Sequence, residues 1–261
     1  MRDRNEKIIY GMYMKQNAFL LCLLSLSFGC NTDGKNVTNE AQYVEEEVCK
    51  EEPETVLRKD TMGLIVLYPQ YTSIDLVCGD MPSKDDSRVI LFAEASYTGE
   101  CLDTFKHFNV AGDHVSAGKR YKGYPCKRNT GAFVYYNNSW KFCHKVYSNE
   151  LDSAALHGGA GFGQELMIYK GKLVPIARKD GNQNQFRALC NHNGKLCIIE
   201  SKGIVRFGDF KKSLLEFGIS DAIYLDMGPG WNHAWYRDKG EIVELHPKEH
   251  DYCTNWITFY K

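Results

Sequence analysis

The sequence has almost no surplus charge of either sign: 32 Lys and Arg stand against 33 Asp and Glu, a formal net charge of −1. Such a chain offers no basic field for a nucleic-acid backbone, so we set nucleic-acid partners aside. Its ten cysteines include no CxxC pair, which argues against a zinc ribbon and against dithiol redox catalysis. No apolar run is long enough to span a bilayer as a helix.

Two catalytic motifs are also missing. His246 and His250 are four residues apart, but Pro247 and the lack of a Glu after the first histidine exclude the zincin pattern and favour a polar turn. His157 precedes a glycine-rich segment, residues 158–163, without the strand-loop-helix frame or the Lys-Ser/Thr ending of a nucleotide P-loop. That segment is either a flexible connection or a loop that approaches a substrate, with His157 as a candidate binding residue.

The N-terminal region has the pattern of an export signal. Residues 18–29 form an apolar run preceded by Lys15, as in the h-region of a signal peptide. Gly29 followed by Cys30 resembles the lipobox of bacterial lipoproteins, which implies lipidation of Cys30 and a location in the cell envelope. An ordinary cleaved signal peptide or an uncleaved anchor are the alternatives. Translation from Met14 would by itself give a compact signal.

The residues after Cys30 are polar and acidic. Residues 31–60 contain two clusters of glutamates and few apolar side chains, so they cannot bury enough surface to order themselves. We expect them to form a flexible tether between the membrane and the folded part. The folded part, residues 61–261, is then of a size that suits a single domain.

Turn residues recur between alternating and aromatic-rich runs in this part of the chain. Asn137-Asn138, Lys170-Gly171 and Asn193-Gly194 each separate two runs of β-forming residues, which predicts three hairpins. Further strands are expected over residues 62–68 and 87–95. Many strands and few helices indicate an α+β domain, dominated by mixed or antiparallel sheet.

One clear helix precedes a strand that ends in an acid. Residues 209–218 have helical apolar spacing, with Asp209 as the expected N-cap and Gly218 as the stop. The short apolar run at residues 222–225 reads as a strand, after which Asp226 meets a glycine-containing turn. Glycine N–H groups can approach an anion closely, so Asp226 is a candidate site residue; a charged strand end with a surface turn is the alternative.

The order of these segments resembles a known family. Residues 163–175 (GQELMIYKGKLVP) are similar to the family's segment in which a strand and a hairpin turn follow glycine-rich residues. Residues 186–196 (FRALCNHNGKL) are similar to its arginine-bearing strand. Residues 221–226 (DAIYLD) resemble the start of its Asp-glycine ending. The family is the phosphodiester glycosidase family, and the resemblance is strongest from His157 onward. It implies hydrolysis of a sugar-1-phosphodiester, of the N-acetylglucosamine-1-phosphodiester type, at the glycosidic bond.

The resemblance also implies site residues. Asp226 matches the family's acid, Arg187 its arginine, and Gly228 and Gly230 fall in its glycine run. Arg187 would hold a phosphate oxygen with a fork of donors, and Asp226 would orient the sugar or water, act as a base, or hold a cation. A carboxylate such as Asp226 also suits a divalent cation such as calcium. Trp231, Trp235 and Tyr236 are candidates for stacking on a sugar ring, with a role in the hydrophobic core as the alternative.

The chain departs from the family at two places. Met227, Pro229, Trp231 and Asn232 stand where the family has small residues, and Pro229 removes a backbone N–H donor. The family's early Asn-Gly-Gly segment has its nearest counterpart in residues 109–114, which supply Asn109 and Gly112 as candidate binding residues and His114 as a candidate acid-base residue. A polar surface loop is the alternative for His114.

Eight cysteines follow Cys30, an even number that permits disulfides in an exported domain. Only one pair is constrained by local structure, because the turn at Asn193-Gly194 places Cys190 opposite Cys197. The two are either bonded or small buried side chains, and we favour the latter.

Two hypotheses therefore follow from the sequence. The first is a lipid-anchored hydrolase that acts on phosphate-linked sugars of envelope or environmental glycans, with a sugar-phosphate or glycan ligand. The second is a catalytically inactive glycan-binding or surface-partner lipoprotein on the same scaffold. Asp226 and Arg187 favour the first, and the altered turn at residues 227–232 favours the second.

Overall fold

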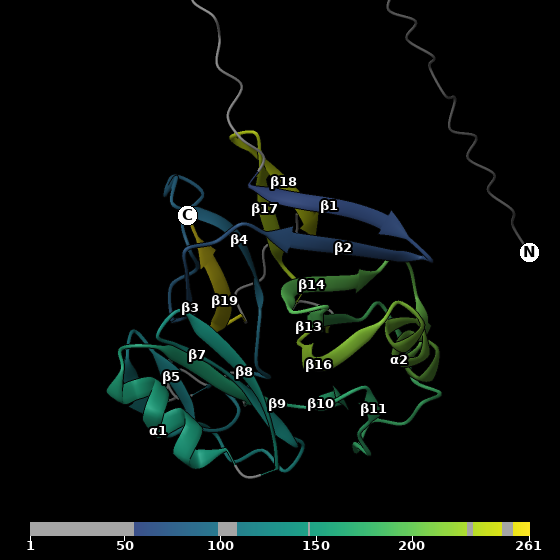
Figure 1. Cartoon of the computed structure of the whole chain (residues 1–261), viewed down its shortest axis with the longest axis horizontal. Helices are drawn as coiled ribbons and strands as arrows, with labels where there is room; N and C mark the ends of the chain where they lie inside the picture. The colour runs from purple at the N-terminus through teal and green to yellow at the C-terminus, as the bar shows by residue number, and fades with distance from the viewer. Residues whose placement is uncertain (1–54, 99–108, 146, 229–231, 247–252) are drawn as a thin grey trace, which may run out of the picture. The chain divides into compact units, whose positions relative to one another are not determined.

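Antiparallel sheets dominate the computed structural model, which describes residues 55–98, 109–145, 147–228, 232–246 and 253–261 (Figure 1). The largest sheet has seven strands in the order β1-β2-β14-β13-β16-β10-β11. These strands are β1 (Val56–Thr61), β2 (Leu64–Pro69), β10 (Leu166–Tyr169), β11 (Lys172–Leu173), β13 (Arg187–His192), β14 (Lys195–Ser201) and β16 (Ile219–Leu225).

Two five-stranded sheets and a small ribbon complete the described strands. The second sheet has the order β18-β17-β4-β19-β3 and the third the order β6-β5-β9-β7-β8. Their strands are β3 (Ser73–Cys78), β4 (Val89–Glu94), β17 (Ala234–Asp238), β18 (Glu241–His246) and β19 (Asn255–Tyr260), then β5 (His114–Ser116), β6 (Lys119–Tyr121), β7 (Gly131–Tyr136), β8 (Ser139–His144) and β9 (Ala160–Gln164). The ribbon pairs β12 (Gln183–Asn184) with β15 (Val205–Arg206).

Two helices occur in the described residues, α1 (Ser148–Leu156) and α2 (Phe207–Glu216). Every strand ladder in these residues is antiparallel, so the prediction of a sheet-dominated domain with few helices is confirmed. The described residues, from residue 55 to residue 261, all belong to one compact unit. No described helix combines the length and apolarity that crossing a membrane requires.

The core lies between the sheets, and each helix covers an outer face. The central strand β4 is buried along its whole length because its VILFAE sequence packs on both faces. Phe210 and Leu214 of α2 pack on the outer face of the seven-stranded sheet, and Leu151 and Ala154 of α1 on that of the third sheet (Figure 1). Burying each large apolar side chain contributes roughly 1.5–3 kcal/mol, which attaches the helices to the sheets.

Three hairpins form where the turn residues predicted them. Both central residues have positive φ in each turn, at 51° and 54° in Asn137-Asn138, 50° and 74° in Lys170-Gly171, and 53° and 78° in Asn193-Gly194. This geometry matches the twist of the flanking strands. Cys190 lies opposite Cys197 as expected, and none of the six cysteines in the described residues forms a disulfide.

Three local predictions were wrong at their boundaries. The first strand begins at Val56, so part of the expected tether at residues 31–60 belongs to the sheet. Met62 and Gly63 have positive φ and close the β1–β2 hairpin instead of starting a strand. Asp209 does not cap α2, because the helix starts at Phe207 and the Asp209 carboxylate pairs with the Arg206 guanidinium at 2.7 Å. Gly218, at φ +90°, follows the helix end as predicted.

Candidate functional site

Asp226 lies where the first and second sheets meet. It follows β16 directly, and its backbone N–H donates to the Ala95 carbonyl just beyond β4, at 3.0 Å. Its carboxylate accepts hydrogen bonds from the backbone N–H groups of Met227, at 2.9 Å, and Thr98. The side chain is 9% exposed. Burial raises the pKa of Asp226 to about 7, although these N–H groups and two nearby arginines, Arg178 and Arg187, favour its ionised form.

A second buried carboxyl lies beside Asp226. Glu94 ends β4, is fully buried, and accepts a hydrogen bond from the Cys253 thiol at 2.9 Å on Oε2. Its Oε1 has no hydrogen-bond partner among the described residues. Burial, and then the charge of Asp226, raise the pKa of Glu94 well above its ordinary value. The two carboxyls are therefore coupled, and both have pKa values above those of ordinary carboxyls.

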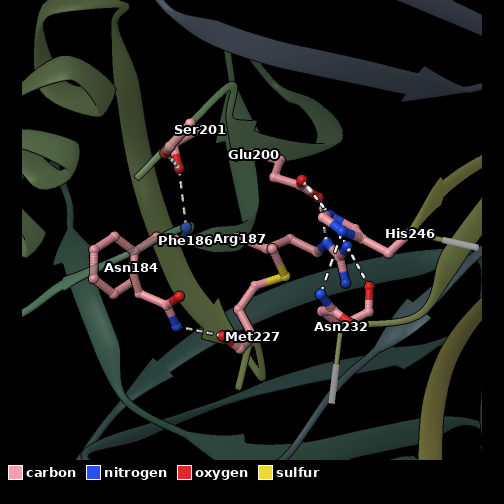
Figure 2. A network of polar contacts seen from close by, with 9 residues as sticks. Asn184, Phe186, Arg187, Glu200, Ser201, Met227, Asn232 and His246 are labelled. Atoms are coloured by element: carbon pink, nitrogen blue, oxygen red, sulfur yellow. Dashed lines mark hydrogen bonds and ion pairs between the residues drawn. The ribbon is translucent and has the colours of Figure 1, made fainter. Parts of the chain in front are cut away.

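Arg187 is fully buried one strand away, with its charge already paired. It lies opposite Leu225, and its Nε and Nη2 donate to Glu200 Oε2 at 3.0 and 2.8 Å. Nη2 also donates to the Asn232 carbonyl at 2.9 Å, so Glu200 and Asn232 surround the guanidinium (Figure 2). The fork predicted to hold phosphate is thus occupied by Glu200, and only Nη1 has no partner among the described residues.

His246 completes this network from the second sheet. Its Nε2 lies 2.6 Å from Glu200 Oε1, while the Asn232 amide lies 3.3 Å from Nδ1 (Figure 2). If the amide donates to Nδ1, a neutral ring carries its proton on Nε2, facing Glu200. Burial by itself would raise the pKa of Glu200, but Arg187 and His246 outweigh it and the pKa is lowered. The site thus contains one firmly ionised carboxylate and two with raised pKa.

Arg178 is a more accessible cation near Asp226. Its side chain is 14% exposed, its Nε donates to Glu165 at 3.2 Å, and its Nη2 donates to the Tyr97 hydroxyl. The guanidinium lies 4.3 Å from the centre of the Tyr224 ring. Arg178 stabilises the ionised form of Asp226 more strongly than Arg187 does. An incoming anion would therefore meet Arg178 more readily than Arg187.

The early segment reaches the site through its first residue. Asn109 is 5% exposed. Its neighbour Val110 forms an isolated β-bridge with Thr98, and the backbone N–H of Thr98 donates to the Asp226 carboxylate. The Asn109 Oδ1 has no hydrogen-bond partner among the described residues. Gly112 instead has a packing role: its φ is +89°, and a Cβ there would lie 2.3 Å from the side-chain nitrogen of Asn129.

The two candidate histidines lie outside this cluster. His114 is a buried residue of β5, so the surface-loop alternative is wrong; its ring lies 3.1 Å from the Gly112 carbonyl and stacks on Tyr121. Burial lowers the pKa of His114. His157 is exposed at the end of α1 and stacks on Tyr136. His157 precedes the Ala160 end of β9, and four residues, about 13 Å at 3.3 Å per residue, separate that end from Gln164.

The remaining predicted residues belong to the turn and the aromatic cluster. Gly228 is half-buried next to Met227, whose side chain is buried and whose carbonyl accepts from Asn184 Nδ2 at 2.5 Å (Figure 2). Gly230 and Trp231 lie outside the described residues, as does Cys30. Trp235 is fully buried against Phe92, so the core alternative holds for this aromatic.

Sequence reasoning missed several site residues. Glu94 and Glu200 each interrupt an apolar strand, VILFAE and KLCIIES, and an acid in such a run is a signal that was available. His246 was expected only in a polar turn. No described group of three or more His, Cys, Asp or Glu side chains is arranged to hold a metal ion.

Comparison with known proteins shows that this chain is similar in fold to solved structures. No family model and no curated protein matches the chain. Among solved structures, the catalytic domain of zebrafish N-acetylglucosamine-1-phosphodiester alpha-N-acetylglucosaminidase, auto-inhibited by its pro-peptide, superposes with a TM-score of 0.55 over 80% of this chain and 83% of that chain. The two domains are similar in fold. At 11% identity the similarity extends no further.

A second solved structure gives the same result. A hypothetical protein from Synechocystis superposes with a TM-score of 0.55 at 12% identity, over 79% of this chain and 61% of that chain. The functional argument therefore depends on the side chains of this chain.

Proposed function

We propose that the protein is a hydrolase that cleaves the glycosidic bond of a sugar-1-phosphodiester. The observation that carries the proposal is the buried pair Asp226 and Glu94, in which Asp226 has a pKa of about 7. A carboxyl with this pKa is half ionised at neutral pH, which suits a general base. The similarity of fold to the zebrafish glycosidase domain supports the same reaction class.

In the proposed reaction, ionised Asp226 accepts a proton from a water molecule. The water oxygen forms a bond to the anomeric carbon as the bond from that carbon to the phosphate oxygen breaks. The electron pair leaves with the phosphomonoester, and the sugar gains a hydroxyl group. Burial of the Asp226 carboxyl raises its pKa and so strengthens it as a base.

The phosphate requires a cation in this reaction. We assign that role to Arg178, which pairs with Glu165 but is 14% exposed, because Arg187 is fully buried. The buried Oδ1 of Asn109 has no hydrogen-bond partner among the described residues. Asn109 is therefore the candidate to accept a hydrogen bond from a sugar hydroxyl group. Arg187, Glu200 and His246 then have a structural role and keep the strands of the site in place.

The test is release of sugar from a panel of sugar-1-phosphodiesters by the full chain, with and without calcium. We expect Asp226→Asn to lower the rate at least about 100-fold, because the base is lost. The wild-type rate should rise with pH through about 7, as Asp226 becomes ionised. The matched control is Asp221→Asn, the same change on β16, which should keep most of the activity.

Turnover that is indifferent to Asp226→Asn would overturn the site assignment. Silence of the wild-type chain across a broad panel would favour the second hypothesis, a glycan-binding protein on this fold. The pairing of Arg187 with Glu200 and the Asn232 carbonyl is the structural feature consistent with that alternative.

We also propose that the hydrolase is exported and attached to a membrane by a lipid on Cys30. The support is the apolar run at residues 18–29 and the Gly29-Cys30 junction in the sequence. In bacterial cells supplied with labelled palmitate, the wild-type chain should become labelled and Cys30→Ser should not. Equal labelling of both chains, or of neither, would exclude lipidation at Cys30.

A further inference from the structure

A separate groove lies at the other end of the β13–β14 hairpin. It has a volume of about 560 Å³, in the range of small-molecule sites. Its walls come from the β1–β2 pair, the β13–β14 turn, the segment after β2 and Trp140 of β8. Leu196 in the groove and Glu200 in the Asp226 cluster are four residues apart on β14, so roughly 13 Å separates the two sites.

The charges of this groove have one sign. Lys59 and Lys195 line it and are exposed, and His192 also lines it, with Nδ1 2.6 Å from the Tyr68 hydroxyl. No Asp or Glu is among the described residues that line it. Lys59 lies 5.7 Å from the centre of the Tyr68 ring, which keeps its ammonium group near the wall. The groove is therefore complementary to an anion.

Two half-buried aromatic rings, Trp140 and Tyr71, belong to the lining of the groove. Trp140 donates a hydrogen bond to the Tyr71 hydroxyl, and both rings line the groove. Trp140 packs edge-on against Phe142, with 5.8 Å between ring centres, and Tyr71 packs edge-on against Phe259 at 5.4 Å. Rings fixed in this way are suited to stack on the apolar face of a sugar, while Gln70 and Asn193 supply side-chain amides for hydroxyl groups.

We propose that this groove binds an anionic saccharide, with the sugar ring on Trp140 and Tyr71 and the anionic group between Lys59 and Lys195. The inference goes beyond the proposed hydrolysis and does not require it, because it concerns different residues. A binding site of this kind would hold a charged glycan to the protein surface independently of the chemistry at Asp226.

The test is calorimetric titration of the full chain with tri-galacturonic acid as the anionic probe, with maltotriose and inorganic phosphate as comparison ligands. We expect tri-galacturonic acid to bind, and Lys59→Gln with Lys195→Gln to weaken it by roughly tenfold or more, since charge-assisted contacts are lost. Lys172→Gln with Lys212→Gln, which changes two exposed lysines outside the groove, is the matched control and should bind like the wild type.

A second variant tests the aromatic wall. Trp140→Leu keeps an apolar contact with Phe142 but removes the stacking face, so it should weaken the probe while thermal unfolding stays cooperative. Four results would overturn the proposal: no binding of tri-galacturonic acid, equal binding by the Lys59/Lys195 variant, equal affinity for maltotriose, or an affinity that inorganic phosphate alone reproduces. None of them depends on hydrolysis, so the two proposals fail separately.

Discussion

Replacing Arg187 by methionine is expected to lower the free energy of unfolding by about 3–5 kcal/mol, the usual cost of removing one partner of a buried ion pair. The guanidinium is fully buried and makes two bonds to Glu200 and one to the Asn232 carbonyl. Without it, the Glu200 carboxylate stays buried with only His246 as a charge partner. Methionine keeps an unbranched apolar chain, so the loss reports the charge more than a cavity.

Urea unfolding at pH 7 measures this effect. The double change Arg187→Met with Glu200→Met should recover much of the loss, because no uncompensated charge then remains in the core. Arg88→Ala is the surface control: Arg88 pairs with Asp86, its side chain is 73% exposed, and its removal should leave the midpoint almost unchanged. If the single variant Arg187→Met is as stable as the wild type, the network of Arg187, Glu200 and His246 does not hold the two sheets together.

Asp226→Asn is expected to act in the opposite direction and to stabilise the protein at pH 8 by up to about 4 kcal/mol. In the folded chain the pKa of Asp226 is about 7, against 3.8 for an ordinary aspartate. A raised carboxyl pKa means that the folded state retains the proton while the unfolded state releases it. The wild type therefore loses stability as the pH rises from about 4 to about 7, and asparagine avoids that loss.

The measurement is the difference in unfolding free energy between Asp226→Asn and the wild type at pH 4, 6 and 8. The difference should be small at pH 4, where folded Asp226 keeps its proton and the unfolded chain has released only part of it, and should grow toward pH 8. Asp221→Asn, on the same strand but half-buried, should show no such growth. A difference that does not change with pH would mean that Asp226 titrates near its ordinary pKa.

Together these two effects distinguish the parts of the site. Arg187, Glu200 and His246 are paired and stabilise the fold, whereas Asp226 and Glu94 are buried at a cost to it. A protein retains a destabilising carboxyl most readily where the raised pKa serves a reaction. A chain in which Asp226→Asn both gains stability at pH 8 and loses hydrolysis would satisfy both parts of this argument.

Several local features could be predicted from the sequence. The three two-residue hairpins follow from turn residues that tolerate positive φ, and the end of α2 follows from Gly218. Asp226 was placed correctly at a strand end, because the apolar run before it is short and a glycine follows. Each of these depends on contacts between residues close together in the chain.

Local sequence patterns could not identify all the residues that form the site. Glu94, Glu200 and His246 belong to three elements separated by tens of residues, and only the pairing of β4, β14 and β18 within their sheets brings them near Asp226. From the sequence, His114 was expected to belong to the site, and the Arg187 guanidinium was expected to be available to bind phosphate. The structure places His114 in β5 and pairs Arg187 with Glu200.

The sequence by itself determined the sheet-rich character of the domain, its hairpins, the register that sets Cys190 opposite Cys197, and the acid at the end of β16. Turn chemistry and alternating patterns are local, so they can be recognised in one chain. Only the tertiary structure decided which carboxyls have raised or lowered pKa values and which arginine is accessible to a ligand. The reason is that pKa and exposure depend on burial and on neighbours that are distant in sequence.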